Sequence, residues 1–297
     1  MGRITKEATN DEYLLLADAY KDAGTSTKAA YRNQYVKMYE ALDKREIHTV
    51  SEKVIIEAVD DLNISNVNTK SALLNIAVVV RGLPEYELGV KKIINEREKL
   101  RSKIVEHTKD KNDEINLPSY NELLDFMNEK YQSKDYKSYM INYLLIHYQT
   151  RNQDLDFELV KLKKEMKDKT KNYLWYNVRT KKVIYVRNMY KTAKIYNTLT
   201  QEITDTKFIT AFKAVKRLQD TDHKDGVFIK NKGSIATYVI NYTYQKLGEG
   251  RYAKIVINHF KNDLGTLQQI SKNRGSSIQT LLNYYDIEFN HKKKESL

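Results

Sequence analysis

The chain has 297 residues, and its 51 lysine and arginine residues outnumber 39 aspartate and glutamate residues, which gives a net charge of +12. A hydrophobic content of 41% excludes a fully disordered chain, and 30% charged residues with only two prolines indicate a helix-rich protein of about two domains. The absence of cysteine excludes a disulfide scaffold, a thiolate metal site and a cysteine nucleophile.

The first hundred residues carry apolar side chains at spacings of three and four, which predicts amphipathic helices. Short polar turns separate these helices, Thr49 to Glu52 has the pattern of a capping box, and Pro84 ends the fourth helix. The helices are expected at residues 10–23, 25–42, 49–62, 65–83 and 86–107.

The segment 108–116 (TKDKNDEIN) is polar and charged, and the composition changes on its far side. We therefore expect a helical domain at 1–108, a linker at 109–117 and a second domain at 118–297. In the second domain, helices are expected at 119–131, at 136–148 and from 206 onward. Apolar runs of strand period at 173–176 and 183–186, with a further run at 195–199, predict a small antiparallel sheet. The expected fold class is mostly α with this small β-sheet.

The positive charge favours a polyanionic partner, because lysine and arginine release the counterions condensed on phosphates. Drift toward AT-rich codons is the alternative explanation for abundant lysine and tyrosine. The longest apolar stretch, 72–80, is far too short to span a bilayer, and no signal peptide opens the sequence. We therefore expect a soluble protein with no membrane association, in the cytoplasm or with DNA in a nucleoid or nucleus.

The chemistry available to the chain is limited. The six histidines are scattered without metal-ligand spacing, and the GxxxxGK[ST], GxGxxG and GxSxG motifs are all absent. We expect no metal and no cofactor. Arginine, lysine and tyrosine are sufficient for one reaction, in which a tyrosine hydroxyl attacks a DNA phosphodiester, arginines hold the phosphate oxygens and a lysine protonates the leaving oxygen.

Four segments together resemble the tyrosine recombinase (phage integrase) family. Residues 147–155 (HYQTRNQDL) are similar to its first box, TGxRxxEL, and residues 190–194 (YKTAK) resemble its KTGK turn. Residues 263–270 (DLGTLQQI) and 276–284 (SSIQTLLNY) resemble its "dlrtiqell" and "SSixTTxxY" segments.

The resemblance implies a core-binding domain followed by a catalytic domain, which clamp double-stranded DNA between them. It implies that Tyr284 attacks the scissile phosphate and forms a phosphotyrosyl bond. Arg151 and Arg251 would hold the non-bridging oxygens. Lys191 would protonate the leaving 5′ oxygen, and Arg274 would assist. Strand exchange also implies a homo-oligomer, a tetramer, on paired duplexes.

Two departures from the family pattern leave alternatives open. Gly248 stands where the HxxR box has its histidine, and Arg274 or Gly275 replaces the later histidine or tryptophan. The register also admits Tyr285 as the nucleophile, with Tyr284 favoured, and Lys194 as the alternative to Lys191. Lys272 is a weaker substitute for Arg274. The expected function is a site-specific recombinase or integrase of a virus or mobile element. The alternatives are a type IB topoisomerase and a recombinase-fold DNA-binding protein that has lost cleavage.

Overall fold

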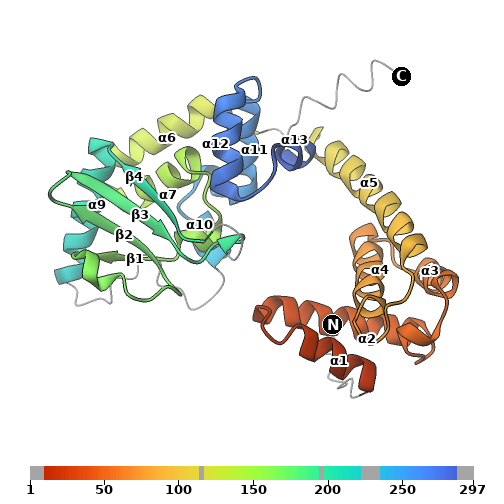
Figure 1. The fold of residues 1–297 in the computed structure, drawn as a ribbon. Helices are drawn as coiled ribbons and strands as arrows, with labels where there is room; N and C mark the ends of the chain where they lie inside the picture. The colour runs from red at the N-terminus through yellow and green to blue at the C-terminus, as the bar shows by residue number, and fades with distance from the viewer. Residues whose placement is uncertain (1–9, 114–116, 194–196, 222–234, 286–297) are drawn as a thin grey trace. The chain divides into compact units, whose positions relative to one another are not determined.

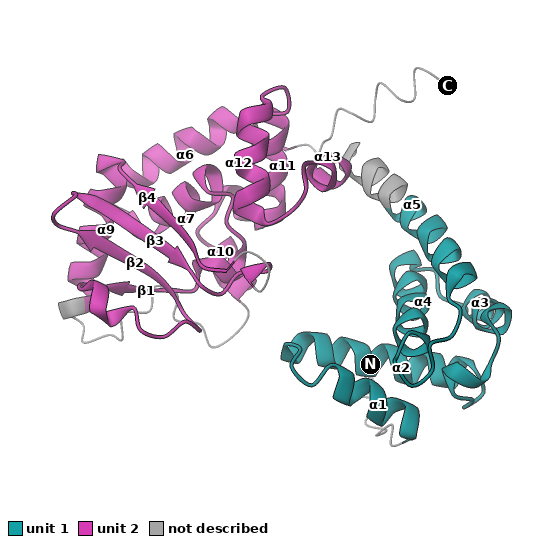
Figure 2. Ribbon diagram, viewed as in Figure 1, with its two compact units in different colours: residues 1–110 teal, residues 111–297 magenta. Residues whose placement is uncertain are grey.

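The computed structural model describes residues 10–113, 117–193, 197–221 and 235–285 (Figure 1). The structure is mostly helical, at 63% helix, and contains one small mixed sheet, consistent with an α+β class. The chain divides into two compact units, Met1–Asp110 and Lys111–Leu297 (Figure 2). None of the helices in the described ranges combines the length and apolar character needed to cross a bilayer.

Unit 1 is a helical unit whose helices follow the predicted order. Polar side chains cap three of them, because Asn10, Ser51 and Asn66 each accept a hydrogen bond from a backbone N–H of the first turn. The fifth helix begins later than expected and continues into the segment expected as a linker. The elements are α1 (Asp11–Ala19), α2 (Thr25–Ala41), the 3-10 turn η1 (Ile47–Thr49), α3 (Glu52–Asp61), α4 (Val67–Arg81) and α5 (Lys91–Asp113).

A buried carboxylate ties the start of unit 1 to its second helix and to η1. The Glu12 side chain is fully buried and accepts hydrogen bonds from the Tyr35 hydroxyl at 2.8 Å and from the Ile47 and His48 backbone N–H groups at 2.9 and 2.7 Å. A buried charge is tolerated only with such partners. Glu12 therefore fixes how α1 lies on the rest of this unit.

Unit 2 surrounds one largely buried helix. Residues 138–146 of α7 are all buried, and this helix packs against α6, α9 and α11. Most of these residues are apolar and none faces water, so tertiary packing stabilises the helix. The helical elements are α6 (Tyr120–Gln132), α7 (Tyr136–His147), η2 (Asn152–Leu155), η3 (Lys163–Glu165), α9 (Thr206–Thr221), α10 (Ile235–Ile240), η4 (Tyr244–Lys246), α11 (Glu249–His259), α12 (Leu264–Arg274) and α13 (Ile278–Tyr285).

The sheet has the order β1-β2-β3-β4 and differs from the prediction in three ways. Strand β1 (Phe157–Val160) was not predicted, since four residues are too few to show a period. It runs parallel to β2 (Asn172–Asn177), because the intervening chain returns to the end of the sheet at which β1 began. The sheet is therefore mixed, and the expectation of a purely antiparallel sheet was wrong. β3 (Lys182–Arg187) pairs antiparallel with both neighbours, and β4 (Leu199–Ile203) begins where the expected strand 195–199 ends.

A buried arginine joins the sheet to the C-terminal helices. Arg187 has no exposed surface, and its Nη1 donates to Asp154 Oδ2 at 3.2 Å and to the Asn273 carbonyl at 3.0 Å. Its Nη2 donates to Gln201 Oε1 at 2.9 Å. Burial raises the pKa of Asp154 even though Arg187 opposes the rise, so desolvation outweighs the attraction of the pair. This one guanidinium thus links η2, β3, β4 and α12.

We predict that Arg187→Met lowers the free energy of unfolding by about 3–5 kcal/mol, because it leaves Asp154 as an uncompensated buried charge. Urea unfolding followed by circular dichroism measures the change. The double variant Arg187→Met/Asp154→Leu removes both charges and is expected to recover a large part of the loss. A loss below about 1 kcal/mol in the single variant would contradict the structural role of the pair.

Candidate active site

Two arginines that are far apart in the sequence meet where α7 and α12 end. Arg151 Nη2 donates to the carbonyl of Arg274 at 2.9 Å and to Ser276 Oγ at 3.2 Å. In return, Arg274 Nη1 donates to the carbonyl of Gln149 at 3.2 Å. Each guanidinium therefore holds the backbone segment that carries the other, and the first and last predicted motifs come together.

The electrostatics of this pair favour an anion. Arg274 is 3% exposed and Arg151 is half-buried. Burial lowers the pKa of Arg151, and the neighbouring positive charge of Arg274 lowers it further. The Nε atom of each arginine is buried without a hydrogen-bond partner in the described part of the chain. Both side chains stay protonated at working pH, so the cluster keeps an excess of positive charge and of donors.

Glu249, which no sequence motif singled out, contributes a carboxylate to this cluster. Its Oε1 lies 3.5 Å from Arg274 Nη2, and its Oε2 is buried without a hydrogen-bond partner among the residues described. An acidic residue in the first turn of a helix is ordinary, because it complements the helix dipole. The sequence therefore does not distinguish Glu249 from other acidic residues in the first turn of a helix.

Tyr285 contacts Arg274, one of the two arginines of the cluster. The Tyr285 hydroxyl accepts a hydrogen bond from Arg274 Nη2 at 3.2 Å, and its ring centre lies 5.1 Å from the Arg274 guanidinium carbon. Asn258 Nδ2 donates to the Tyr285 carbonyl at 2.8 Å and so holds the end of α13 on α11. Tyr284 is exposed, which is consistent with the 100° step between consecutive helix residues. The sequence pattern favoured Tyr284, and the geometry favours the alternative that it left open.

The turn that carries Lys191 packs against the junction of α12 and α13. Gly275 ends α12 in the left-handed conformation, with φ of 58°. A Cβ atom at this position would lie 1.9 Å from Thr192 Oγ1, so only glycine permits the close approach. Lys191 is exposed and directly precedes Thr192. Lys194, the alternative lysine, lies outside the described residues.

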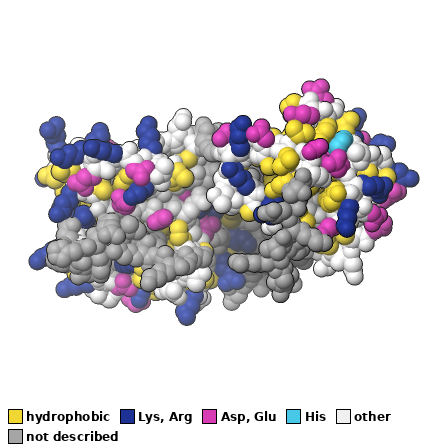
Figure 3. All heavy atoms as spheres, turned by 90° about the horizontal axis from the view of Figure 1, so that it is seen from below, with side chains coloured by type: hydrophobic (Ala, Val, Ile, Leu, Met, Phe, Trp, Pro, Cys, Tyr) yellow, Lys and Arg dark blue, Asp and Glu magenta, His cyan; other side chains and the backbone are white. Residues whose placement is uncertain are grey.

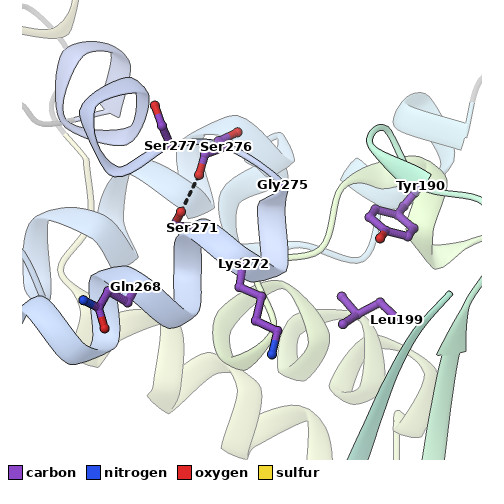
Figure 4. Close-up of a pocket in the computed structure, with 8 residues that line it drawn as sticks. All are labelled: Tyr190, Leu199, Gln268, Ser271, Lys272, Gly275, Ser276 and Ser277. Atoms are coloured by element: carbon purple, nitrogen blue, oxygen red, sulfur yellow. Dashed lines mark hydrogen bonds between the residues drawn. The ribbon is translucent and has the colours of Figure 1, made fainter. Parts of the chain in front are cut away.

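A pocket of about 400 Å³ separates this turn from α12. Figure 4 shows Gln268 and Lys272 projecting from α12, with Tyr190 and Leu199 on the opposite side. Ser271 Oγ donates to the Ser276 carbonyl at 2.5 Å and stabilises the turn between the two helices. The lining residues are Tyr190, Leu199, Gln268, Ser271, Lys272, Gly275, Ser276 and Ser277.

Arg251 lies outside the cluster. It is exposed in the first turn of α11, two residues after Glu249 and therefore about 200° further round the helix. Within the described residues no hydrogen bond or ion pair joins it to Arg151 or Arg274. Burial lowers the pKa of Lys254, and the charge of Arg251 lowers it further, so these two cations share a different face. The structure thus brings together Arg151, Arg274 and the Lys191 turn, but not Arg251.

Comparison of the chain with models of protein families, with curated proteins and with solved structures finds no match in any of the three. Among the residues that the structure describes, no group of three or more histidine, aspartate or glutamate side chains is arranged to hold a metal ion.

We predict that Glu249→Gln raises the affinity of the protein for inorganic phosphate by about tenfold, because it removes a negative charge that repels phosphate from the arginine pair. Isothermal titration calorimetry measures the affinity. Glu249→Asp, which keeps the charge, is the matched control and is expected to bind phosphate much as the parent protein does. Weaker binding by Glu249→Gln would show that the carboxylate holds Arg274 in place and does not compete with the anion.

Proposed function

We propose that this protein cleaves and rejoins double-stranded DNA through a phosphotyrosyl intermediate on Tyr285. The observation that carries the proposal is the hydrogen bond between Arg274 Nη2 and the Tyr285 hydroxyl, with Arg151 bound to the same segment. A nucleophilic hydroxyl, two guanidiniums and a nearby lysine turn are the groups that phosphodiester transfer requires. The motif resemblance supports the same reaction.

In this mechanism, the Tyr285 hydroxyl releases its proton to solvent, and its oxygen forms a bond to phosphorus as the bond from phosphorus to the 5′ oxygen breaks. Arg151 and Arg274 donate to the non-bridging oxygens, whose negative charge grows in the transition state. Lys191 gives its proton to the leaving 5′ oxygen. The phosphotyrosyl bond conserves the energy of the broken bond, so rejoining needs no nucleotide. Arg274 takes the part that the sequence pattern assigned to Arg251.

The product of this chemistry is a recombined or integrated DNA, formed by several protomers on paired duplexes. A type IB topoisomerase would use the same groups as a monomer, and relaxation of a supercoiled plasmid without a second site would indicate it. A binding-only protein is the second candidate. Two observations favour it. Arg151 and Arg274 already donate to backbone carbonyls, and Arg251 is exposed outside the cluster.

We predict that Tyr285→Phe abolishes the covalent protein–DNA adduct and leaves DNA binding intact, because only the attacking hydroxyl is lost. Denaturing gel electrophoresis of a reaction on nicked duplex DNA detects the adduct. Tyr284→Phe is the matched control and is expected to form it.

The reverse pattern, with an adduct from Tyr285→Phe and none from Tyr284→Phe, would return the nucleophile to Tyr284. If the parent protein binds nicked duplexes but never becomes attached to one, including duplexes of its own genomic sequence, the binding-only function replaces the enzymatic one.

We predict that Lys191→Ala slows cleavage at least about 100-fold while DNA affinity changes little, because the leaving oxygen loses its proton donor. A substrate with sulfur at the 5′ bridging position leaves without protonation and is expected to restore the rate. Single-turnover kinetics on the two substrates measure both effects. An equal loss on both would assign Lys191 to phosphate binding or to the structure of the turn.

A further inference from the structure

The connection between β1 and β2 has an unusual composition. Residues 161–171 (KLKKEMKDKTK), hereafter the lysine loop, contain six lysines and two acidic residues, which leaves a charge of +4. Eleven residues therefore supply a third of the net charge of the whole chain, +12. All six lysines are exposed. On the face shown in Figure 3, lysine and arginine side chains project widely from the surface of unit 2.

The two acidic residues of the lysine loop bind its own backbone and not its lysine side chains. Glu165 Oε2 accepts from the backbone N–H of Lys161 at 3.1 Å. Asp168 Oδ1 accepts from the Thr170 backbone N–H at 2.8 Å and from its hydroxyl at 2.5 Å, and these bonds lower the pKa of Asp168. Within the described residues, no ion pair engages four of the lysines. These four are Lys163, Lys164, Lys167 and Lys169.

The lysine loop is held in one shape by its neighbours on the sheet. Trp175 Nε1 donates to the Lys161 carbonyl at 3.1 Å, and the Tyr173 hydroxyl donates to the Asp168 carbonyl at 3.0 Å. Lys171 pairs with Glu158 at 2.6 Å. A backbone that is ordered before binding loses less entropy when a ligand binds to it. The exposed ammonium groups are thus attached to an organised support.

Hydrogen bonds connect the end of the lysine loop to the segment that leads into the Lys191 turn. Asn188 Nδ2 donates to the Lys171 carbonyl at 2.7 Å. The buried Asn172 side chain accepts from the backbone N–H groups of Asn188 and Met189 at 2.9 and 2.7 Å. Met189 precedes Lys191 by two residues. A duplex with a phosphate near Lys191 would therefore have further phosphates within reach of the loop.

We infer that the lysine loop binds the phosphate backbone of duplex DNA beside the candidate active site. This inference rests on the proposed function and adds a second region of DNA contact to it. Lysine suits this task because a flexible point charge can follow phosphates of any sequence. An acidic protein partner fits less well, since lysine is depleted from protein interface cores. Leu162, at 50% exposed, is the one large hydrophobic side chain of the loop with substantial exposure.

The test compares two charge-matched variants of the full chain. The loop variant replaces Lys163, Lys164, Lys167 and Lys169 with glutamine. The control variant makes the same replacement at four exposed lysines elsewhere in unit 2, namely Lys134, Lys181, Lys207 and Lys246. Fluorescence anisotropy with a short duplex of arbitrary sequence gives the dissociation constant at a series of salt concentrations, and thermal unfolding followed by circular dichroism confirms that both variants fold.

We expect the slope of log affinity against log salt to become shallower by about 3 to 4 in the loop variant, since each lost phosphate contact removes about 0.9. In the control variant we expect a change below about 1. An unchanged slope in the loop variant, or an equal change in both variants, would overturn the inference. In the first case, the lysines would be available to another class of partner; in the second, only overall charge would matter.

The covalent adduct assay on the parent protein separates this inference from the proposed function. A parent protein that forms the adduct while its loop variant keeps the full salt slope would refute the lysine loop alone. A parent protein that forms no adduct while its loop variant loses the slope would refute the phosphotyrosyl mechanism alone.

Discussion

The guanidinium of Arg187 is the constraint on which the second unit depends. A fully buried positive charge requires partners on several sides, and Arg187 finds them in Asp154, Gln201 and the carbonyl of Asn273. Two of these anchors lie beside the arginines of the candidate site. Asp154 also accepts the backbone N–H of Arg151, and Asn273 directly precedes Arg274. Through these two anchors, Arg187 helps to fix the backbone from which both arginines of the candidate site project.

Much of the fold could be predicted from the sequence because local patterns dictate it. The helices of unit 1 follow apolar spacing and capping residues, and α6 begins at the capping box of Ser119 and Glu122. The errors occur where local pattern is weak. β1 has only four residues, and its parallel pairing with β2 depends on the route of the lysine loop, which no period in the sequence records. The start of α5 was also misplaced, because the charged segment from Tyr86 continues a helical pattern through residues that form a turn.

The sequence predicted several residues of the candidate site, but it predicted less of how these residues are arranged. Motif order predicted that Arg151, the Lys191 turn and the segment from Asp263 to the tyrosines share one site, and the structure places contacts between these segments. Motif order could not decide between Tyr284 and Tyr285, because two alignments that differ by one residue are possible beside Gly275. A shift of one residue corresponds to about a third of a helical turn. It also assigned Arg251 to the site, whereas the structure shows Arg251 exposed on another face of α11 from Glu249, and it gave Glu249 no role. Register within a helix is resolved only when tertiary contacts are known.

The pairing of Arg151 with the backbone at Arg274 joins positions 123 residues apart. Contacts of such long range form late in folding, because the intervening chain must first be ordered. During synthesis, the ribosome releases Arg151 and Lys191 well before Tyr285 exists. A chain that stops before Tyr285 therefore already carries Arg151 and Lys191 but lacks Arg274 and Tyr285, which complete the candidate site.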